Sequence, residues 1–187
     1  MSETLYLAGA MTFLRPWAEA IVRPVPEGAT APCAKRIENR SWTPPFSLWS
    51  RWVALHTGKG TDAQGLAWMR ETYRYPWTMA DAAPAGQIIG LMRVSGWIER
   101  TLAGVWKRPF LGTQTELTEP PPWWFGPVRD GKPNYGWVIE DVLAFEQDPV
   151  PVARGMLGIW RLDAEAFAGV SARVEALRPG TEVRRAR

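Results

Sequence analysis

Lys35, Glu38 and Arg40 stand close together in the first quarter of the chain and supply charges of both signs. Trp17 precedes them on a predicted short helix, and His56, the only histidine, follows them. The set combines an aromatic surface, charged groups and one side chain that titrates near neutrality. These residue types suit the binding of a planar, hydrogen-bonding ligand such as a nucleobase. They could also support acid–base chemistry.

The segment that must position these charged side chains covers residues 35–42, and its pattern predicts a strand. The prolines at 44 and 45 should terminate this strand. Strict alternation along the strand would place Glu38 and Arg40 on one face and Lys35 on the other. We therefore expect a bulge, or the twisted end of the strand, to bring the three side chains together.

The rest of the chain predicts short strands and few helices. Strands are expected over residues 5–13, 35–42, 51–56, 86–100, 135–145 and 155–162. One helix should begin at Pro16 and end by residue 23, and another should cover residues 62–73 behind a capping box formed by Thr61 and Gln64. Phe167, Val170, Val174 and Leu177 mark an amphipathic C-terminal helix.

Residues 101–134 are expected to form a long, irregular excursion. Three prolines at 120–122 are followed at once by Trp123, Trp124 and Phe125. Adjacent aromatic residues argue against simple disorder, and long loops in compact domains tend to be functional. Together the elements predict an α+β, barrel-like fold of about five to six strands flanked by two to three helices.

Composition limits the classes of function. The chain has 187 residues, one cysteine and no Gly-rich phosphate loop, so we expect no cofactor and no multi-cysteine metal site. No apolar run approaches the ~18 residues that span a membrane, which favours a cytoplasmic protein without a membrane partner. The net charge of +3 comes entirely from residues 151–187, whose basic end suggests a solvated, frayed tail. A broad basic face that coats phosphate backbone is not expected.

Several segments resemble one known family. Arg-Pro-Trp-Ala at 15–18, Lys-x-x-Glu-x-Arg at 35–40 and His-Thr-Gly-Lys at 56–59 are similar, in this order, to motifs of ASCH-domain proteins of the PUA-like superfamily. Segments 86–90, 135–142 and 149–160 resemble the later strands of that family. The resemblance covers about residues 10–162. It implies a PUA-like β-barrel domain over 1–162, with an insertion at 101–134 and a C-terminal helix and basic tail at 163–187.

The resemblance also implies a function. ASCH-like proteins are associated with binding RNA or single-stranded nucleic acid, and some act as amidohydrolases on a modified nucleoside or as ribonucleases. Lys35 matches the lysine that the amidohydrolase group uses in catalysis. That group has a threonine nucleophile three positions later, where this chain has Glu38. Because a carboxylate cannot replace an activated hydroxyl in acyl transfer, this difference weakens the acetylcytidine hydrolase interpretation.

We therefore expect a monomeric binding module that captures a base, which can be modified, in RNA or single-stranded DNA or as a nucleoside. Trp17 and either Trp123 or Trp124 would stack on the base, Lys35 and Lys59 would hold phosphate or carbonyl oxygens, and Glu38 would read a donor edge. The expected ligand-binding set is Trp17, Lys35, Glu38, Arg40, His56, Lys59, Trp123, Trp124, Asn134 and Tyr135.

Three other interpretations remain open. A hydrolase would draw its catalytic groups from Lys35, Glu38 and His56. Structural roles are also open, with Arg40 holding Glu38, His56 a satisfied core histidine, and most of the 12 tryptophans packed in the interior. Finally, the Pro/Trp-rich excursion could bind a protein partner.

Overall fold

The computed structural model describes residues 3–101, 103–110, 113–125, 134–145, 148–152 and 154–186, and shows an α+β fold. The strands are β1 (Glu3–Arg15), β2 (Ile37–Arg40), β3 (Trp52–Thr61), β4 (Gln87–Arg100), β5 (Trp106–Phe110), β6 (Thr113–Leu117), β7 (Asn134–Ala144), β8 (Val150–Pro151), β9 (Ile159–Trp160) and β10 (Thr181–Arg185). The helices are α1 (Trp17–Val22), α2 (Ala63–Tyr73) and α3 (Ala164–Leu177), with short 3-10 turns η1 (Phe46–Leu48) and η2 (Met79–Asp81).

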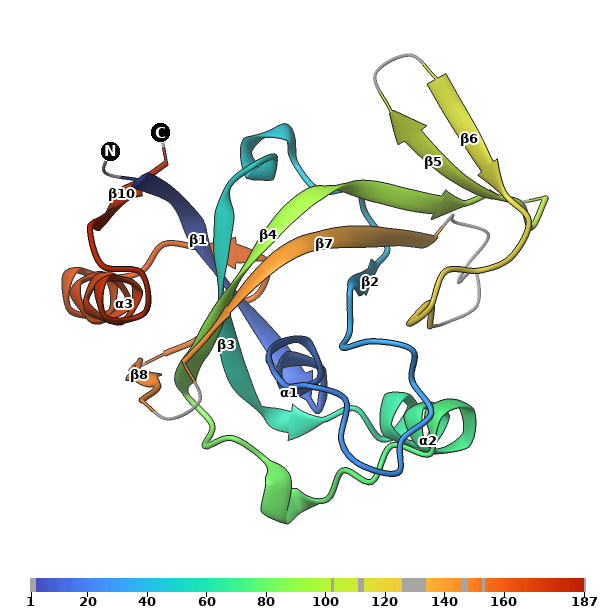
Figure 1. Cartoon of the computed structure of the whole chain (residues 1–187), viewed down its shortest axis with the longest axis horizontal. Helices are drawn as coiled ribbons and strands as arrows, with labels where there is room; N and C mark the ends of the chain where they lie inside the picture. Colours follow the sequence, from blue (N-terminus) through green and yellow to red (C-terminus); the bar gives the residue numbers. More distant parts are fainter. Residues whose placement is uncertain are drawn as a thin grey trace.

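All ten strands belong to one sheet, whose main path runs β10-β1-β3-β4-β5-β6. β7 pairs with both β4 and β2, while β8 joins β4 and β9 joins β1. β1 runs parallel to β3 and β10, and the β3–β4–β7–β2 series is antiparallel (Figure 1). No ladder among the described residues joins β2 to β1, so the sheet is open and the expected barrel closure is not confirmed.

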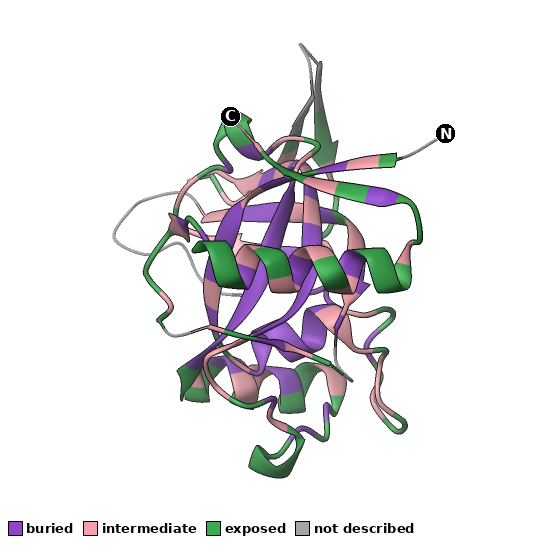
Figure 2. Ribbon diagram, turned by 90° about the vertical axis from the view of Figure 1, so that its left-hand side faces the viewer, coloured by how far each residue is buried: buried purple, intermediate pink, exposed green. Residues whose placement is uncertain are grey.

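Two hydrophobic cores lie on the two faces of this sheet. Along β3, Val53 and Leu55 enter the first core, whereas Trp52 and Ala54 enter the second. α1 and α2 cover the first core, and α3 covers the second with the side that carries Val170. Figure 2 shows α3 lying across the buried strands with its exposed side outward. The two cores explain why strands such as β3 and β4 are apolar at successive positions rather than alternating.

Two segments that were expected to lack regular structure contain strands. The excursion expected to be irregular contains the β5–β6 hairpin, in which Lys107 lies opposite Glu116 with their charged atoms 3.3 Å apart. The tail expected to be frayed forms β10, which pairs with β1 from Glu3 opposite Thr181 onward. All three strands, β5, β6 and β10, gain their order from a neighbouring strand, which a local pattern does not reveal.

The start of α2 also differs from the prediction. Its N-cap is Asp62, whose carboxylate accepts a hydrogen bond from the backbone N–H of Gly65. The helix therefore begins one residue later than a Thr61 cap requires, in agreement with the strong N-cap preference of aspartate. No helix in the described part of the chain is long and apolar enough to cross a membrane.

Candidate functional site

Lys35, Glu38 and Arg40 form one connected ionic cluster. The Lys35 ammonium Nζ lies 2.6 Å from Glu38 Oε2, and Arg40 Nη2 lies 2.9 Å from Glu38 Oε1. The Lys35 side chain is 1% exposed and that of Glu38 7%, whereas Arg40 is 26% exposed. The cluster thus carries two cations and one carboxylate, and only its arginine reaches solvent.

The irregular start of β2 brings these side chains together. β2 begins at Ile37, so Lys35 lies just before the strand, and its backbone N–H donates to the Ala20 carbonyl of α1. Its ammonium then turns back to donate to both the Ile37 carbonyl and Glu38. The expectation that the end of the strand, rather than regular alternation, makes the three residues converge is confirmed.

Burial and charge act on Lys35 in opposite directions. Removal from water lowers the pKa of the Lys35 ammonium below its ordinary value, and the adjacent Glu38 carboxylate partly offsets this effect. The ammonium also lies 5.3 Å from the centre of the Trp17 ring, in cation–π distance. A buried amine with a lowered pKa beside a carboxylate is a common feature of functional sites, although structural ion pairs show it too.

Trp17 anchors α1 and is covered by other rings. Its Nε1 donates to Asp62 Oδ2 at 2.9 Å, which ties α1 to the start of α2. Phe125 and Trp68 lie over it, with ring centres 5.4 and 6.4 Å away. Gly65 allows this packing, because a Cβ there would lie 2.2 Å from the Trp17 ring. A base could therefore stack on Phe125 or Trp68, which are half-buried, rather than on Trp17 itself.

Trp123, one of the two residues of the excursion that were expected to stack on a base, lies in the first core. It is fully buried, and its indole Nε1 donates to the Cys33 carbonyl at 2.8 Å. Its backbone N–H donates to the Tyr73 hydroxyl, and its carbonyl accepts from Asn39. Its φ of 68° is unusual for a bulky residue and is held by these contacts. Trp123 cannot stack on a ligand in this arrangement.

Asn39 of β2 holds the backbone of both Trp123 and Phe125. Its amide oxygen accepts from the backbone N–H of Phe125 at 3.0 Å, while its amide nitrogen donates to Trp123. The Phe125 ring reaches the ionic cluster through Trp17, whose ring centre lies 5.4 Å from that of Phe125 and 5.3 Å from the Lys35 ammonium. We call Trp17, Lys35, Glu38, Arg40, Trp68 and Phe125 together the ionic–aromatic site.

The remaining expected residues lie around or away from this site. Trp124 packs against Gly136 and, edge-on, against Trp106, whose ring centre is 6.4 Å away. Tyr135 lies opposite Arg40 in the β2–β7 ladder, and Asn134 begins β7 opposite Arg100. Lys59 lies at the exposed end of β3, and the described residues show no contact between it and the ionic cluster.

His56 lies on the other face of the sheet. Its Nδ1 is 3.0 Å from Thr12 Oγ1, and its ring meets Trp160 of the second core edge-on at 5.4 Å. Gly155 passes so close that a Cβ there would lie 2.2 Å from the imidazole. The hypothesis that His56 shares a hollow with Trp17 and Lys35 is therefore wrong, because successive β3 side chains alternate between the two cores.

Acidification should destabilise the fold through His56. Burial lowers the pKa of His56 below its ordinary value of 6.5. The unfolded chain then binds a proton below pH 6.5 that the folded chain resists, so the free energy of unfolding falls as the pH drops from 6.5 toward the lower pKa of the folded state. Urea unfolding between about pH 7 and pH 5 should therefore show a steeper loss of stability for the wild type than for His56→Gln. Equal slopes in the two proteins would contradict this prediction.

Sequence reasoning did not assign Asn39, Trp68 or Phe125 to the site. The position of Asn39 inside the Lys-x-x-Glu-x-Arg segment was the signal that could have pointed to it. Alternation along the strand places it on the opposite face from Glu38. Trp68 on α2 has no local feature that distinguishes it from a core residue. Among the described residues, no cluster of His, Cys, Asp and Glu could hold a metal ion.

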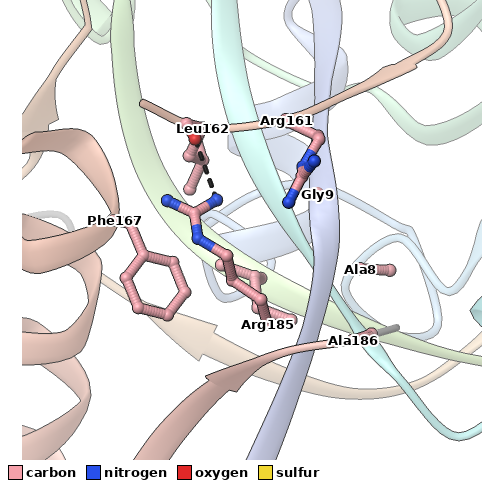
Figure 3. A pocket seen from close by; sticks show the side chains of 8 residues that line it. Ala8, Gly9, Arg161, Leu162, Phe167, Arg185 and Ala186 are labelled. Atoms are coloured by element: carbon pink, nitrogen blue, oxygen red, sulfur yellow. Dashed lines mark hydrogen bonds between the residues drawn. The ribbon is translucent and has the colours of Figure 1, made fainter. Parts of the chain in front are cut away.

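Two cavities lie away from the ionic–aromatic site. One, of about 20 Å³, is lined by Arg161, Phe167 and Arg185, and has room for about one water molecule (Figure 3). Arg185 donates there to the Leu162 carbonyl and stacks on Phe167, so it fastens β10 to α3. The other cavity, of about 370 Å³, lies beside α1 and η2.

Among the comparisons with known proteins, only the comparison with solved structures gives a match. No family model and no curated protein matches the chain. The chain is similar in structure to an ASCH protein. The crystal structure of ASCH from Zymomonas mobilis matches with 10% sequence identity and a TM-score of 0.42, over 95% of this chain and 98% of that one. This is the family that the motifs resemble. At this degree of similarity no residue role and no activity transfers from one protein to the other.

Proposed function

We propose that the chain binds RNA or single-stranded DNA and holds one base and its phosphate at the ionic–aromatic site. The observation that carries the proposal is the ionic cluster itself, a buried lysine–glutamate pair whose excess positive charge ends on the solvent-reaching Arg40. Phe125 and Trp68 provide half-buried rings against Trp17, whose own ring lies 5.3 Å from the Lys35 ammonium. Arginine donors and aromatic faces are the two elements that single-strand binding sites combine.

Each residue has a distinct role in this proposal. Arg40 contacts the phosphate or a base carbonyl, since a guanidinium suits both. Glu38 orients Arg40 and neutralises Lys35, because each of its oxygens already accepts from one of these cations. Phe125 offers its ring to the base. The Trp17 ring packs against the Phe125 ring and holds it in place. The hydrogen bonds of the Trp123 backbone to Asn39 and Tyr73 fix the chain that leads to Phe125.

Two variants test the proposal by titration of intrinsic tryptophan fluorescence with short RNA and DNA oligonucleotides. Phe125→Ala should weaken binding by about 1–3 kcal/mol, the value of one base stacked on an aromatic ring. Arg40→Gln should weaken binding and reduce the dependence of affinity on salt by about one phosphate contact. Comparison of RNA with DNA of the same sequence then establishes which of the two is preferred.

Phe167→Ala and Arg161→Gln are the matched controls, because they remove the same groups at the small cavity beside α3. They should leave binding unchanged. If no oligonucleotide or nucleoside alters the fluorescence up to millimolar concentration, or if the controls lower affinity as much as the site variants, the proposal fails.

A second candidate, hydrolysis of RNA or of a modified nucleoside, is favoured by one observation. The lowered pKa of Lys35 means that its buried amine, beside Glu38, releases a proton at a lower pH than an ordinary lysine does, and a substrate would have to reach it through Arg40. Incubation with RNA and with acetylated cytidine tests this function by analysis of the products. Product formation that Lys35→Met abolishes and Lys59→Met retains would support it, and the absence of product with both substrates would exclude these reactions.

A further inference from the structure

The last strand, β10, leaves one edge of the sheet open. It stands at the end of the strand order, and β1 is its only strand partner among the described residues. Figure 1 shows it at the margin of the molecule, beside the two ends of the chain. No proline, glycine or bulge interrupts its five residues, although such features commonly keep an edge strand from pairing. Charged side chains have the same effect, so their arrangement on β10 decides which partner fits.

The backbone of β10 offers hydrogen bonds to a partner at alternate residues. The N–H of Ala186, directly after the strand, donates to the Leu7 carbonyl of β1 at 2.9 Å. In a parallel pair every second residue bonds to the neighbouring strand, so the even-numbered residues of β10 bond to β1. The odd-numbered residues, with Val183 at the centre, therefore direct their backbone groups to the open edge. The Thr181 N–H agrees with this assignment, since it donates to the Arg178 carbonyl rather than to β1.

The side chains of β10 divide between the two faces of the sheet. Val183 packs on the second core and lies opposite Leu5 of β1. Glu182 and Arg184 lie on the other face, where their side chains are 54% and 55% exposed and their charged atoms are 2.7 Å apart. Tyr6 of β1, opposite Arg184, is also exposed there. The strand thus carries one negative and one positive charge, each one residue away from Val183.

This arrangement makes β10 complementary to itself. When a second copy pairs antiparallel, with Val183 opposite Val183, each Glu182 lies directly opposite Arg184 of the other copy. The same register lets the two Val183 residues exchange the backbone hydrogen bonds that point to the open edge. Charge complementarity and free backbone groups therefore select the same partner in the same register.

We propose that β10 is a dimer interface, at which two copies of the chain join their sheets antiparallel about a two-fold axis at Val183. The interface is isologous, so each contact occurs twice. The strand is short compared with the roughly 20–30 residues a side of a standard interface, so the dimer should be weak and its population should depend on concentration. β10 shares no residue with the ionic–aromatic site, so the inference goes beyond the proposed function and does not depend on it. It replaces the monomer that we expected from the sequence.

Reversal of one charge tests the register by sedimentation equilibrium from micromolar to millimolar protein. Arg184→Glu places two glutamates directly opposite each other on both sides of the two-fold axis, which is destabilising. Its dissociation constant should exceed that of the wild-type dimer by about tenfold or more. The double variant Glu182→Arg/Arg184→Glu restores opposite charges and should restore association. Arg108→Glu is the matched control, because it makes the same change of charge at an exposed residue of β5 and should associate like the wild type.

Amide hydrogen exchange measured by NMR provides a second test, which needs no variant. Exchange at Val183 and Arg185 should slow as the protein concentration rises, because their N–H groups become hydrogen-bonded only in the dimer. The amides of Glu182 and Arg184 should be protected at every concentration, since they bond to β1.

Several results would overturn the inference. The first is a wild type that stays monomeric at millimolar concentration, even if the open edge then accepts a strand of another protein. Arg184→Glu that associates as tightly as the wild type, or no more weakly than Arg108→Glu, would show that the copies meet elsewhere. A double variant that associates no better than Arg184→Glu, or exchange at Val183 that does not depend on concentration, would exclude the antiparallel register.

Discussion

Glu38→Gln is expected to lower the free energy of unfolding by about 3–5 kcal/mol at neutral pH, the usual effect of breaking a buried ion pair. The variant leaves the Lys35 ammonium, 1% exposed, without a carboxylate. It also removes the partner of Arg40, so binding at the ionic–aromatic site should weaken together with stability. Urea unfolding followed by tryptophan fluorescence measures the first effect, and oligonucleotide titration of the folded variant measures the second.

The destabilisation should depend on pH. In Glu38→Gln, burial lowers the pKa of Lys35 with no carboxylate to oppose it. The unfolded chain then holds a proton that the folded chain releases, so stability rises as the pH increases toward the ordinary lysine value of 10.5. The difference between wild type and variant should therefore shrink between about pH 7 and pH 10.

The double variant Lys35→Met/Glu38→Gln serves as the control. It removes the stranded ammonium, so it should be more stable than Glu38→Gln alone, with a favourable coupling energy that a double-mutant cycle measures. Additive effects of the two substitutions, or a loss for Glu38→Gln below about 1 kcal/mol, would show that the pair behaves as an exposed one and would contradict the buried cluster.

Trp123→Ala should destabilise the fold by about 3–5 kcal/mol, as expected for removal of a large core aromatic residue. The substitution leaves a cavity among Trp68, Tyr73 and Tyr75, whose rings surround Trp123. It also leaves the Cys33 carbonyl without the indole donor. The midpoint of urea unfolding, at unchanged slope, measures the loss.

Trp124→Ala is the matched control for this prediction, because it removes the same side chain from the next position, which is only half-buried. We expect a clearly smaller loss than for Trp123→Ala. The prediction is contradicted if Trp123→Ala is as stable as the wild type but binds oligonucleotides more weakly. Trp123 would then contact the ligand and would not belong to the core.

The adjacent tryptophans Trp123 and Trp124 differ in role because of their tertiary contacts. Trp123 and Trp124 are equivalent in the sequence, since both follow the proline run. Only the φ of 68° at Trp123 and its hydrogen bonds to distant residues turn one indole into the core and leave the other near the surface. Local patterns carry no record of such long-range contacts.

Local patterns by themselves determined the α+β class and most of the elements. The start of α1 after Pro16, the helix that follows residue 62, the long strand β4 and the C-terminal helix all follow from periodicity and from residues that stop or cap helices. They also located the ionic cluster, because lysine, glutamate and arginine lie within six positions of each other.

Tertiary structure alone decided which candidate residues meet. It buried Lys35 and Trp123, added Phe125 and Trp68 to the site, and placed His56 in the opposite core. It also ordered β10 and the β5–β6 hairpin, whose partners lie elsewhere in the chain or across a turn. The physical reason is that backbone periodicity sets the direction of a side chain within its own element, whereas burial and contact depend on how separate elements pack.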